Sequence, residues 1–358
     1  MKEIGIVKHM KKYEVFSGDF LCGVVEEDRF CPSGEGIVPL ALLNGENFTK
    51  WVSDRALSSD RGLTARSLKS ASGLSPHTSE FDTAMRIHAA SITDNYWMRK
   101  SDESITYREV CLDSYDGFFA HLALGLDYSV SDYLSKKNNP ELTNIGNSDK
   151  AWQIDRDGQR WLYKRQPLRE CFQEILASKI AFCLGVSTVE YELVVASEPN
   201  PELGRTGIVR SRDFTQNRGL NLEHVSGLVK DEHSVREAAE LFDRYGLVKE
   251  YLDLRYLDIL TGNPDRHVFN YGFLRDQKTG RISDIAPNFD NNFAFMAMLP
   301  VEEFVSVAKN YVWAPTEMNL SLLIFDRKEI AAFENYPIDA YLKTVREKEK
   351  QIKELLMG

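Results

Sequence analysis

The sequence of 358 residues predicts an α+β fold of two lobes, preceded by a smaller N-terminal α/β subdomain. Three observations support this fold class. Short apolar runs flank polar or glycine-containing turns at several places, which is typical of β-hairpins. Longer segments repeat apolar residues at the spacing of an amphipathic helix. The length, with 43% hydrophobic and 27% charged residues, allows two globular domains or one large bilobed domain.

The first predicted element is a hairpin, because strand-like runs lie on both sides of the turn Ser17-Gly18-Asp19. Residues 46–90 are then expected to be mainly helical, with a Ser- and Gly-rich loop inside 70–79. Extended structure is predicted again at Tyr96-Trp97-Met98.

A domain boundary is predicted between residues 115 and 140, where a polar stretch rich in Lys and Asn ends at Pro140. We therefore expect three units. Residues 1–125 form an accessory subdomain, residues 126–213 form a first lobe, and residues 214–358 form a mainly helical second lobe.

A second hairpin is predicted over residues 152–164, with its turn at Asp155-Arg156-Asp157-Gly158. Antiparallel pairing brings Lys164 back beside Lys150, which ends a small polar loop. This hairpin therefore places two lysines next to each other.

Three long helical segments are predicted after this hairpin. Apolar residues recur at helical spacing over residues 168–184, and Gly185 is a suitable stop. Residues 186–195 are rich in β-branched side chains and resemble a strand. A second helical region covers 235–260, with Gly246 as its weak point, and a third covers 341–356.

The residues most suited to chemistry follow the second helical region, where Asn263-Pro264 ends the helix and begins a loop. Asp265, His267 and Asn270 lie on this loop. A further hairpin over residues 271–285 returns the chain, so that Asp290 is expected near Asn270.

An asparagine and an aspartate supply the hard oxygen ligands that Mg²⁺ prefers, so Asn270 and Asp290 are candidate metal ligands. Asp265 can accept a proton from a hydroxyl group. Structural explanations remain open for each residue. Asp265 and His267 can also brace the loop, Asn270 can be a turn residue, and Lys164 can be an ordinary strand lysine. Glu170 and Glu174 are both candidates to pair with Lys164.

These segments together resemble the HipA-like kinases, including the CtkA-type proteins, and more distantly the phosphatidylinositol kinases. The resemblance covers most of residues 142–295. It is carried by the segments Gly146-Asn147-Ser148-Asp149-Lys150-Ala151-Trp152, Tyr163-Lys164, Gln173-Glu174-Ile175-Leu176-Ala177-Ser178, 263–274 and Asn288-Phe289-Asp290. The implied fold is bilobed and protein-kinase-like, of the HipA type.

The resemblance also implies roles for the candidate residues. Lys164 would contact the phosphates of ATP and pair with Glu174, Asp265 would be the catalytic base with His267 as a helper, and Asn270 and Asp290 would hold Mg²⁺. A phosphate loop over residues 144–150 would cover the phosphates, and its candidate contacts are Asn144, Gly146, Asn147, Ser148 and Lys150. Adenine would meet the backbone near Arg212 and Phe214. Autophosphorylation is expected at Thr143, with Ser148 as the second candidate.

The sequence departs from the kinase pattern at three points. The phosphate loop has one glycine, Gln173 replaces a frequent Asn, and Asp290 is followed by Asn291-Asn292 with no Asp-Phe-Gly motif. We expect an ATP- and Mg²⁺-dependent protein Ser/Thr kinase, with an antitoxin partner if it is a toxin. The alternatives are a lipid or small-molecule kinase and a nucleotide-binding pseudokinase that acts as a scaffold.

Composition limits the partners and the compartment. The formal net charge of −10 and the pI of about 5.4 argue against direct nucleic-acid binding. The five scattered cysteines form no Cys-x-x-Cys pair, so we expect free thiols in a reducing cytoplasm. No window approaches the ~18 apolar residues of a membrane span, so no membrane partner is expected.

Overall fold

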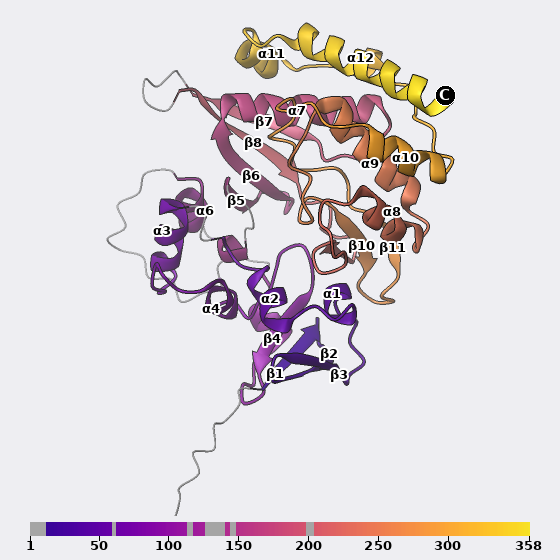
Figure 1. Ribbon diagram of the computed structural model, residues 1–358. Helices are drawn as coiled ribbons and strands as arrows, with labels where there is room; N and C mark the ends of the chain where they lie inside the picture. Colours follow the sequence, from indigo (N-terminus) through magenta and orange to yellow (C-terminus); the bar gives the residue numbers. More distant parts are fainter. Residues whose placement is uncertain (1–11, 59–61, 113–116, 126–139, 144–147, 198–203) are drawn as a thin grey trace, which may run out of the picture.

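A computed structural model describes residues 12–58, 62–112, 117–125, 140–143, 148–197 and 204–358. Three antiparallel sheets and the helices around them form an α+β architecture, which confirms the predicted fold class (Figure 1). Each sheet lies within one of the three predicted units, although the unit boundaries themselves stay predictions.

The N-terminal sheet has the strand order β3-β2-β1-β4. Its strands are β1 (Tyr13–Ser17), β2 (Phe20–Glu26), β3 (Arg29–Pro32) and β4 (Tyr96–Lys100). The predicted hairpin is the β1–β2 pair. The helices of this part are α1 (Leu40–Leu43), α2 (Phe48–Ser53), α3 (Leu63–Ala71), α4 (Glu80–Met85), α5 (Tyr107–Val110) and α6 (Gly117–Ala123).

The second sheet has the order β5-β6-β8-β7. It consists of β5 (Asp149–Ile154), β6 (Arg160–Pro167), β7 (Tyr191–Ala196) and β8 (Thr206–Arg212). A short 3-10 helix, η3 (Pro140–Thr143), lies before β5. The strands β5 and β6 pair as predicted, with Lys150 opposite Lys164. Residues directly opposite each other in an antiparallel pair lie on the same face of the sheet, so both lysines project from one side.

The helix α7 (Leu168–Cys183) follows β6 directly and is buried along most of its length. Its end explains why β7 begins later than residue 186. Gly185 takes a left-handed φ of 70°, and the amide of Val186 donates back to the carbonyl of Ala181 at 2.9 Å. Val186 therefore closes the helix instead of starting the strand.

The third sheet has the order β11-β10-β9 and carries the residues around the predicted loop. Its strands are β9 (Leu220–His224), β10 (Gly272–Asp276) and β11 (Ile282–Ile285). The pair β10–β11 is the predicted third hairpin. The strand β9 had no prediction.

The second helical region is two helices, α8 (Val235–Asp243) and α9 (Val248–Thr261), where one was predicted. Gly246 has a φ of 70°, and the amide of Leu247 donates to Phe242 at 3.0 Å, which closes α8. The remaining helices are α10 (Glu302–Asn310), η4 (Leu320–Leu322), α11 (Arg327–Phe333) and α12 (Ile338–Met357).

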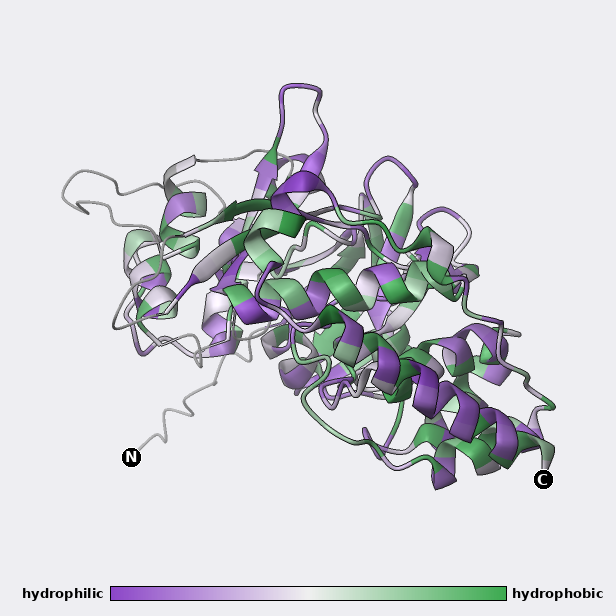
Figure 2. Cartoon of the chain, turned by 90° about the horizontal axis from the view of Figure 1, so that it is seen from above, coloured by the Kyte–Doolittle hydropathy of each residue, from purple (hydrophilic) through white to green (hydrophobic). Residues whose placement is uncertain are grey.

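The largest hydrophobic core joins the second sheet to the C-terminal helices through α7. Phe172 of α7 stacks on Tyr336 with ring centroids 4.5 Å apart, and on the same helix Ile175 and Leu176 are fully enclosed. Figure 2 shows hydrophilic residues along the outer helices near the C-terminus. The two lobes therefore share one core, which fixes the second sheet relative to the loop after α9.

Candidate active site

The loop that follows α9 is held in one shape by its own side chains. Gly262 ends the helix in the left-handed region. The backbone amide of Asp265 donates to Asn263 Oδ1 at 3.2 Å. Asn270 Nδ2 donates to the carbonyl of Asp265 at 2.8 Å. Because its nitrogen is used in this way, the Oδ1 atom of Asn270 is the acceptor that remains for a ligand.

The buried side chain of Arg266 also fixes the loop, although it had no predicted role. It is buried and pairs with Asp258 of α9, with Nη2 2.9 Å from Oδ1. Its Nη1 donates to the carbonyls of Asn270 at 2.9 Å and Phe289 at 2.8 Å. Its Nη2 also donates to the side-chain oxygens of Asn288 and Asn291. One guanidinium therefore fastens the segment of Asn270 to the segment of Asp290.

A chain of ion pairs crosses from the second sheet to Asp290. Lys164 Nζ lies 2.5 Å from Glu174 Oε1 and 2.8 Å from Asp290 Oδ1. Lys150 Nζ lies 3.1 Å from the other oxygen of Asp290. Glu174 is fully buried, and its second oxygen accepts a hydrogen bond from Gln166 at 2.9 Å. Glu170, the alternative partner, bonds instead to Asn292 at 3.0 Å.

Asp290 remains a carboxylate in this environment. Burial alone would raise its pKa, but Lys150 and Lys164 together hold the pKa well below the ordinary value for aspartate. Burial likewise works to lower the pKa of Lys164, and Asp290 and Glu174 outweigh it, so the ammonium stays charged. Asp290 also has a left-handed φ of 60°, a strained conformation for a residue with a side chain. Its amide donates to the hydroxyl of Tyr191 at 3.1 Å.

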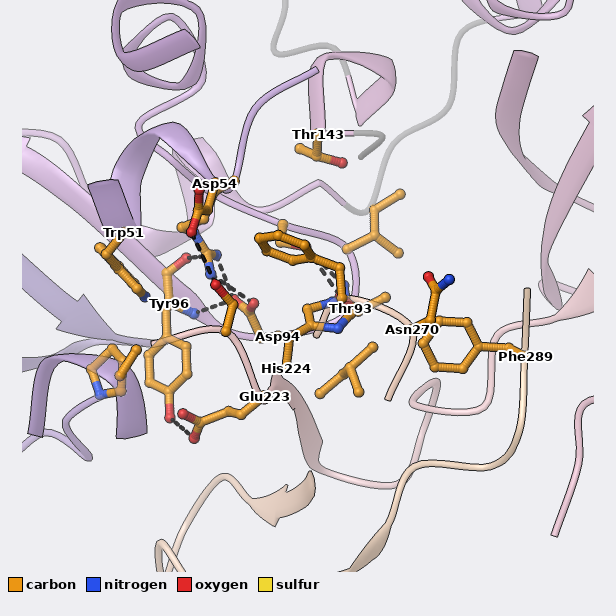
Figure 3. Close-up of a pocket in the computed structure, with 18 of the residues that line it drawn as sticks. Trp51, Asp54, Thr93, Asp94, Tyr96, Thr143, Glu223, His224, Asn270 and Phe289 are labelled. Carbon is orange, nitrogen blue, oxygen red and sulfur yellow. Dashed lines mark hydrogen bonds and ion pairs between the residues drawn. The ribbon is translucent and has the colours of Figure 1, made fainter. Parts of the chain in front are cut away.

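Part of this network, Lys150 and Asp290, lines a cavity that lies between all three sheets (Figure 3). Lys150, Trp152 and Leu162 line it from the second sheet, and Asn270 and Asp290 line it from the second lobe. The N-terminal subdomain contributes a further wall. That wall consists of Trp51, Asp54, Arg55, Asp94 and Tyr96.

His267 lines the cavity, whereas Asp265, two residues earlier, is half-buried and is not among the lining residues. Burial raises the pKa of Asp265, and the charge of Asp290 raises it further, against the opposing effects of His267, Arg266 and Lys150. A carboxylate with a raised pKa is a better proton acceptor than an ordinary aspartate.

His224 of β9 is a cavity residue that the sequence analysis missed. Burial lowers its pKa to about 4, with help from Arg55 and His267, so the imidazole is neutral. Its ring lies edge-on to those of Phe269 and Phe289, at 5.9 and 6.4 Å. His224 forms no metal-binding spacing with the other histidines in the sequence, and the strand β9 that places it here was not predicted.

Thr143 lines the cavity and is buried, and its hydroxyl donates to the carbonyl of Pro140 at 2.7 Å. Ser148 is half-buried directly before β5. The other predicted contacts of the phosphate loop, Asn144, Gly146 and Asn147, lie outside the described residues.

The structure separates Arg212 and Phe214 from the other candidates. Both line a different hollow beside Trp161, and the guanidinium of Arg212 lies 5.1 Å from that indole. Phe214 still approaches the cavity, because its ring stacks at 5.9 Å on Phe289, which lines it.

The residues present fit Mg²⁺ bound together with phosphates. Across the part of the chain that the structure describes, no group of three or more His, Cys, Asp or Glu residues could hold a metal. Mg²⁺ bound with nucleotides needs no such group, since one or two protein oxygens with phosphate and water ligands suffice. The charged carboxylate of Asp290 and the oriented amide of Asn270 on one cavity wall supply two such oxygens.

The sheet with its buried Lys–Glu pair, packed against a braced loop and a second small sheet, defines a fold of the HipA kinase type. HipA of Shewanella oneidensis MR-1, solved with HipB and its operator DNA, is similar with a TM-score of 0.56 and 12% identity, over 97% of this chain and 99% of that one. The proinflammatory kinase CtkA of Helicobacter pylori is similar with a TM-score of 0.40 and 17% identity, over 58% of this chain and 92% of its own. No protein-family model and no curated protein matches the chain.

The likeness to HipA confirms the family resemblance at the level of the fold. The likeness in fold also covers more of the chain than the resemblance in sequence does. The resemblance covered residues 142–295, whereas the fold matches over 97% of the chain.

The expectation of no direct contact with nucleic acid is wrong as a prediction from net charge. The HipA of this fold was solved in a complex with operator DNA. Total charge averages over the whole surface, whereas binding to DNA depends on one local face or on a partner chain. Among the described helices, none is long and apolar enough to cross a membrane.

Proposed function

We propose that this chain is an ATP- and Mg²⁺-dependent phosphotransferase of the HipA-like group, and that it phosphorylates Ser or Thr residues of proteins. One observation carries the proposal. The buried Lys164 joins Glu174 to Asp290, and Lys150 meets the other oxygen of Asp290. A purely structural role explains such a network poorly, since two buried lysines on one aspartate cost desolvation energy that apolar residues would avoid.

The two lysines would bind the phosphates of ATP. Their ammonium groups already face one carboxylate, and phosphate oxygens are equivalent anionic partners. Glu174 would keep Lys164 in position when Asp290 turns to another partner. Asp290 and Asn270 would hold Mg²⁺, which when bound offsets the negative charge of the phosphates.

Asp265 would accept the proton of the acceptor hydroxyl, supported by its raised pKa and its place on the braced loop. His267 would help by keeping the electrostatic balance near Asp265, since it opposes the rise in the pKa of that carboxyl. The apolar side chains Leu162 and Phe289 line the same cavity and would flank adenine, next to Phe214, whose ring stacks on that of Phe289.

Autophosphorylation is proposed at Thr143, with Ser148 as the second site. Thr143 lines the same cavity as Asp290, which supports its hydroxyl as a phosphate acceptor. The hydroxyl donates to Pro140 within η3, so phosphorylation would require that hydrogen bond to break. A bulky dianion in this buried position would displace η3.

A complex with a protein partner on DNA is part of the proposal. It is supported by the assembly in which HipA of this fold was solved, which contains HipB and operator DNA. The chain would then be the toxin of a pair with an antitoxin. All five cysteines are free, which suits the reducing cytoplasm.

The test is transfer of γ-labelled phosphate from Mg-ATP in a cell lysate, with label followed separately in protein, lipid and small-molecule fractions. We expect label in protein, on Ser or Thr, and none with Asp265→Asn. Label confined to lipid or small molecules would replace the protein acceptor. If the wild type binds nucleotide but no fraction is labelled, phosphotransferase activity is refuted and the pseudokinase alternative is favoured.

A further inference from the structure

A second cavity, the back cavity, is lined by Asn263, Pro264 and Arg266 of the loop and shares no lining residue with the front cavity of Asp290. Tyr251 and Arg255 of α9 line it, together with Tyr271, Arg266 and Ser234. It is small and mostly polar, and none of the roles proposed for the active site uses it.

Among the described residues, three hydrogen-bond donors on the side chains that line this cavity have no protein partner. The Nε atom of Arg255 is buried and makes no hydrogen bond, while its Nη1 donates to Asp258 at 3.0 Å. Tyr251 and Tyr271 are 2% and 4% exposed, and within the described residues neither hydroxyl has a hydrogen-bond partner. Buried polar groups are nearly always paired, so donors left over at a cavity need a partner there, either water or a ligand.

The chemistry of these donors selects an anion. Burial raises the pKa of Tyr271 to about 12, so its hydroxyl keeps its proton, and the pKa of Tyr251 is raised further for the same reason. Arg255 is always charged. The cavity also meets the start of α8, where Ser234 caps a helix of nine residues whose positive dipole end favours anions. Among the lining residues the carboxylate is Glu232, which is exposed and lies at the rim.

We propose that this cavity is a binding site for a tetrahedral oxyanion, namely a phosphoryl group, held by Arg255, Tyr251 and Tyr271. The guanidinium and two phenols supply three donor groups around one cavity, which matches the several acceptor oxygens of a phosphoryl group. The ligand is either free phosphate or a phosphorylated side chain. The site does not depend on the proposed kinase activity.

The site is connected to the front of the loop through one carboxylate. Asp258 binds Arg255 through Oδ2 and Arg266 through Oδ1, and Arg266 holds the carbonyls of Asn270 and Phe289. An anion that draws Arg255 away from Asp258 changes the charge balance at Arg266. Binding of an anion in the back cavity would therefore change how Arg266 holds the segments that carry Asn270 and Asp290.

The experiment is calorimetric titration of the full chain with inorganic phosphate at constant ionic strength, and separately with O-phospho-L-serine. The test variant is Tyr251→Phe with Tyr271→Phe, which removes two hydroxyls and little volume. The matched control is Tyr256→Phe on the same helix, a buried tyrosine whose hydroxyl is also unpaired but which lies outside the cavity. A Lys150→Met variant removes a cation of the cavity that holds Asp290, so a loss of binding in this variant would assign the phosphate to that cavity and overturn the proposed site.

We expect phosphate to bind, the double variant to weaken binding at least about tenfold, and Tyr256→Phe and Lys150→Met to leave it unchanged. Binding of phosphoserine as well supports a phosphorylated side chain as the source, and binding of phosphate alone supports the free anion. Failure of the wild type to bind either probe would overturn the site. So would equal affinities in the wild type and the double tyrosine variant.

Discussion

Replacing Arg266 with lysine tests whether one buried guanidinium holds the site together. The substitution keeps the charge and therefore the ion pair with Asp258. It removes the planar group that reaches both the carbonyl of Asn270 and the carbonyl of Phe289. Any loss is therefore a loss of hydrogen-bonding geometry and not of charge.

The expected cost follows from counting the partners. Arg266 donates to five acceptor groups, which are the side chains of Asp258, Asn288 and Asn291 and the carbonyls of Asn270 and Phe289. A lysine ammonium has three donors, so at least two acceptors lose their hydrogen bond. Each buried polar group left unpaired costs roughly 1–3 kcal/mol, which gives a decrease of about 2–6 kcal/mol in the free energy of unfolding.

Urea unfolding followed by circular dichroism measures this difference. The control is Arg218→Lys at an exposed arginine, where we expect a change within about 0.5 kcal/mol. A cost below about 1 kcal/mol for Arg266→Lys would show that the five contacts do not hold the loop.

Three further predictions concern the ion pairs and the loop. Glu174→Gln should lower the rate of phosphate transfer by at least roughly tenfold, while Glu170→Gln on the same helix should change it little; steady-state kinetics of both variants decides this. Because burial raises the pKa of Asp265, its carboxylate is lost at a higher pH than that of an ordinary aspartate, so the transfer rate should fall on an acid limb above pH ~4 in a pH–rate profile. The pKa of Asp290 is lowered in the folded state, so its carboxylate stabilises the fold at pH values above its unfolded pKa of ~3.9, and this stability is lost as the pH falls further. The free energy of unfolding, measured at several pH values, should show this dependence in the wild type and a weaker one in Asp290→Asn.

The sequence predicted the parts of the fold that local patterns encode. Turn residues flanked by apolar runs located the hairpins, and strand pairing then placed Lys164 beside Lys150. Gly246 was predicted to be a weak point within one helix, but its left-handed φ ends α8. Helical periodicity alone does not distinguish a weak point from a helix end. The strand β9 escaped prediction because it is defined by its pairing with β10, which is distant in sequence.

The candidate site was predicted less completely than the fold. Asp265, His267 and Asn270 were visible as a motif, but Arg266 between them was not assigned any role. Its partners lie on α9 and after β11, and only the packed structure brings them together. Asp258 stands among apolar residues in the buried last turns of α9, residues 256–261, and this was the available signal. The wall contributed by the N-terminal subdomain had no local pattern at all.

The most direct test of the account is the initial rate of phosphate incorporation from Mg-ATP, into the purified chain or a lysate, for the wild type and Asp265→Asn side by side. Mass spectrometry then locates the modified residues, including Thr143 and Ser148. We predict incorporation by the wild type and a decrease of about 10²–10⁴-fold in the variant, with nucleotide binding retained. Equal rates for the two proteins, or no transfer by a wild type that binds Mg-ATP, would contradict the assignment of this cavity to phosphoryl transfer.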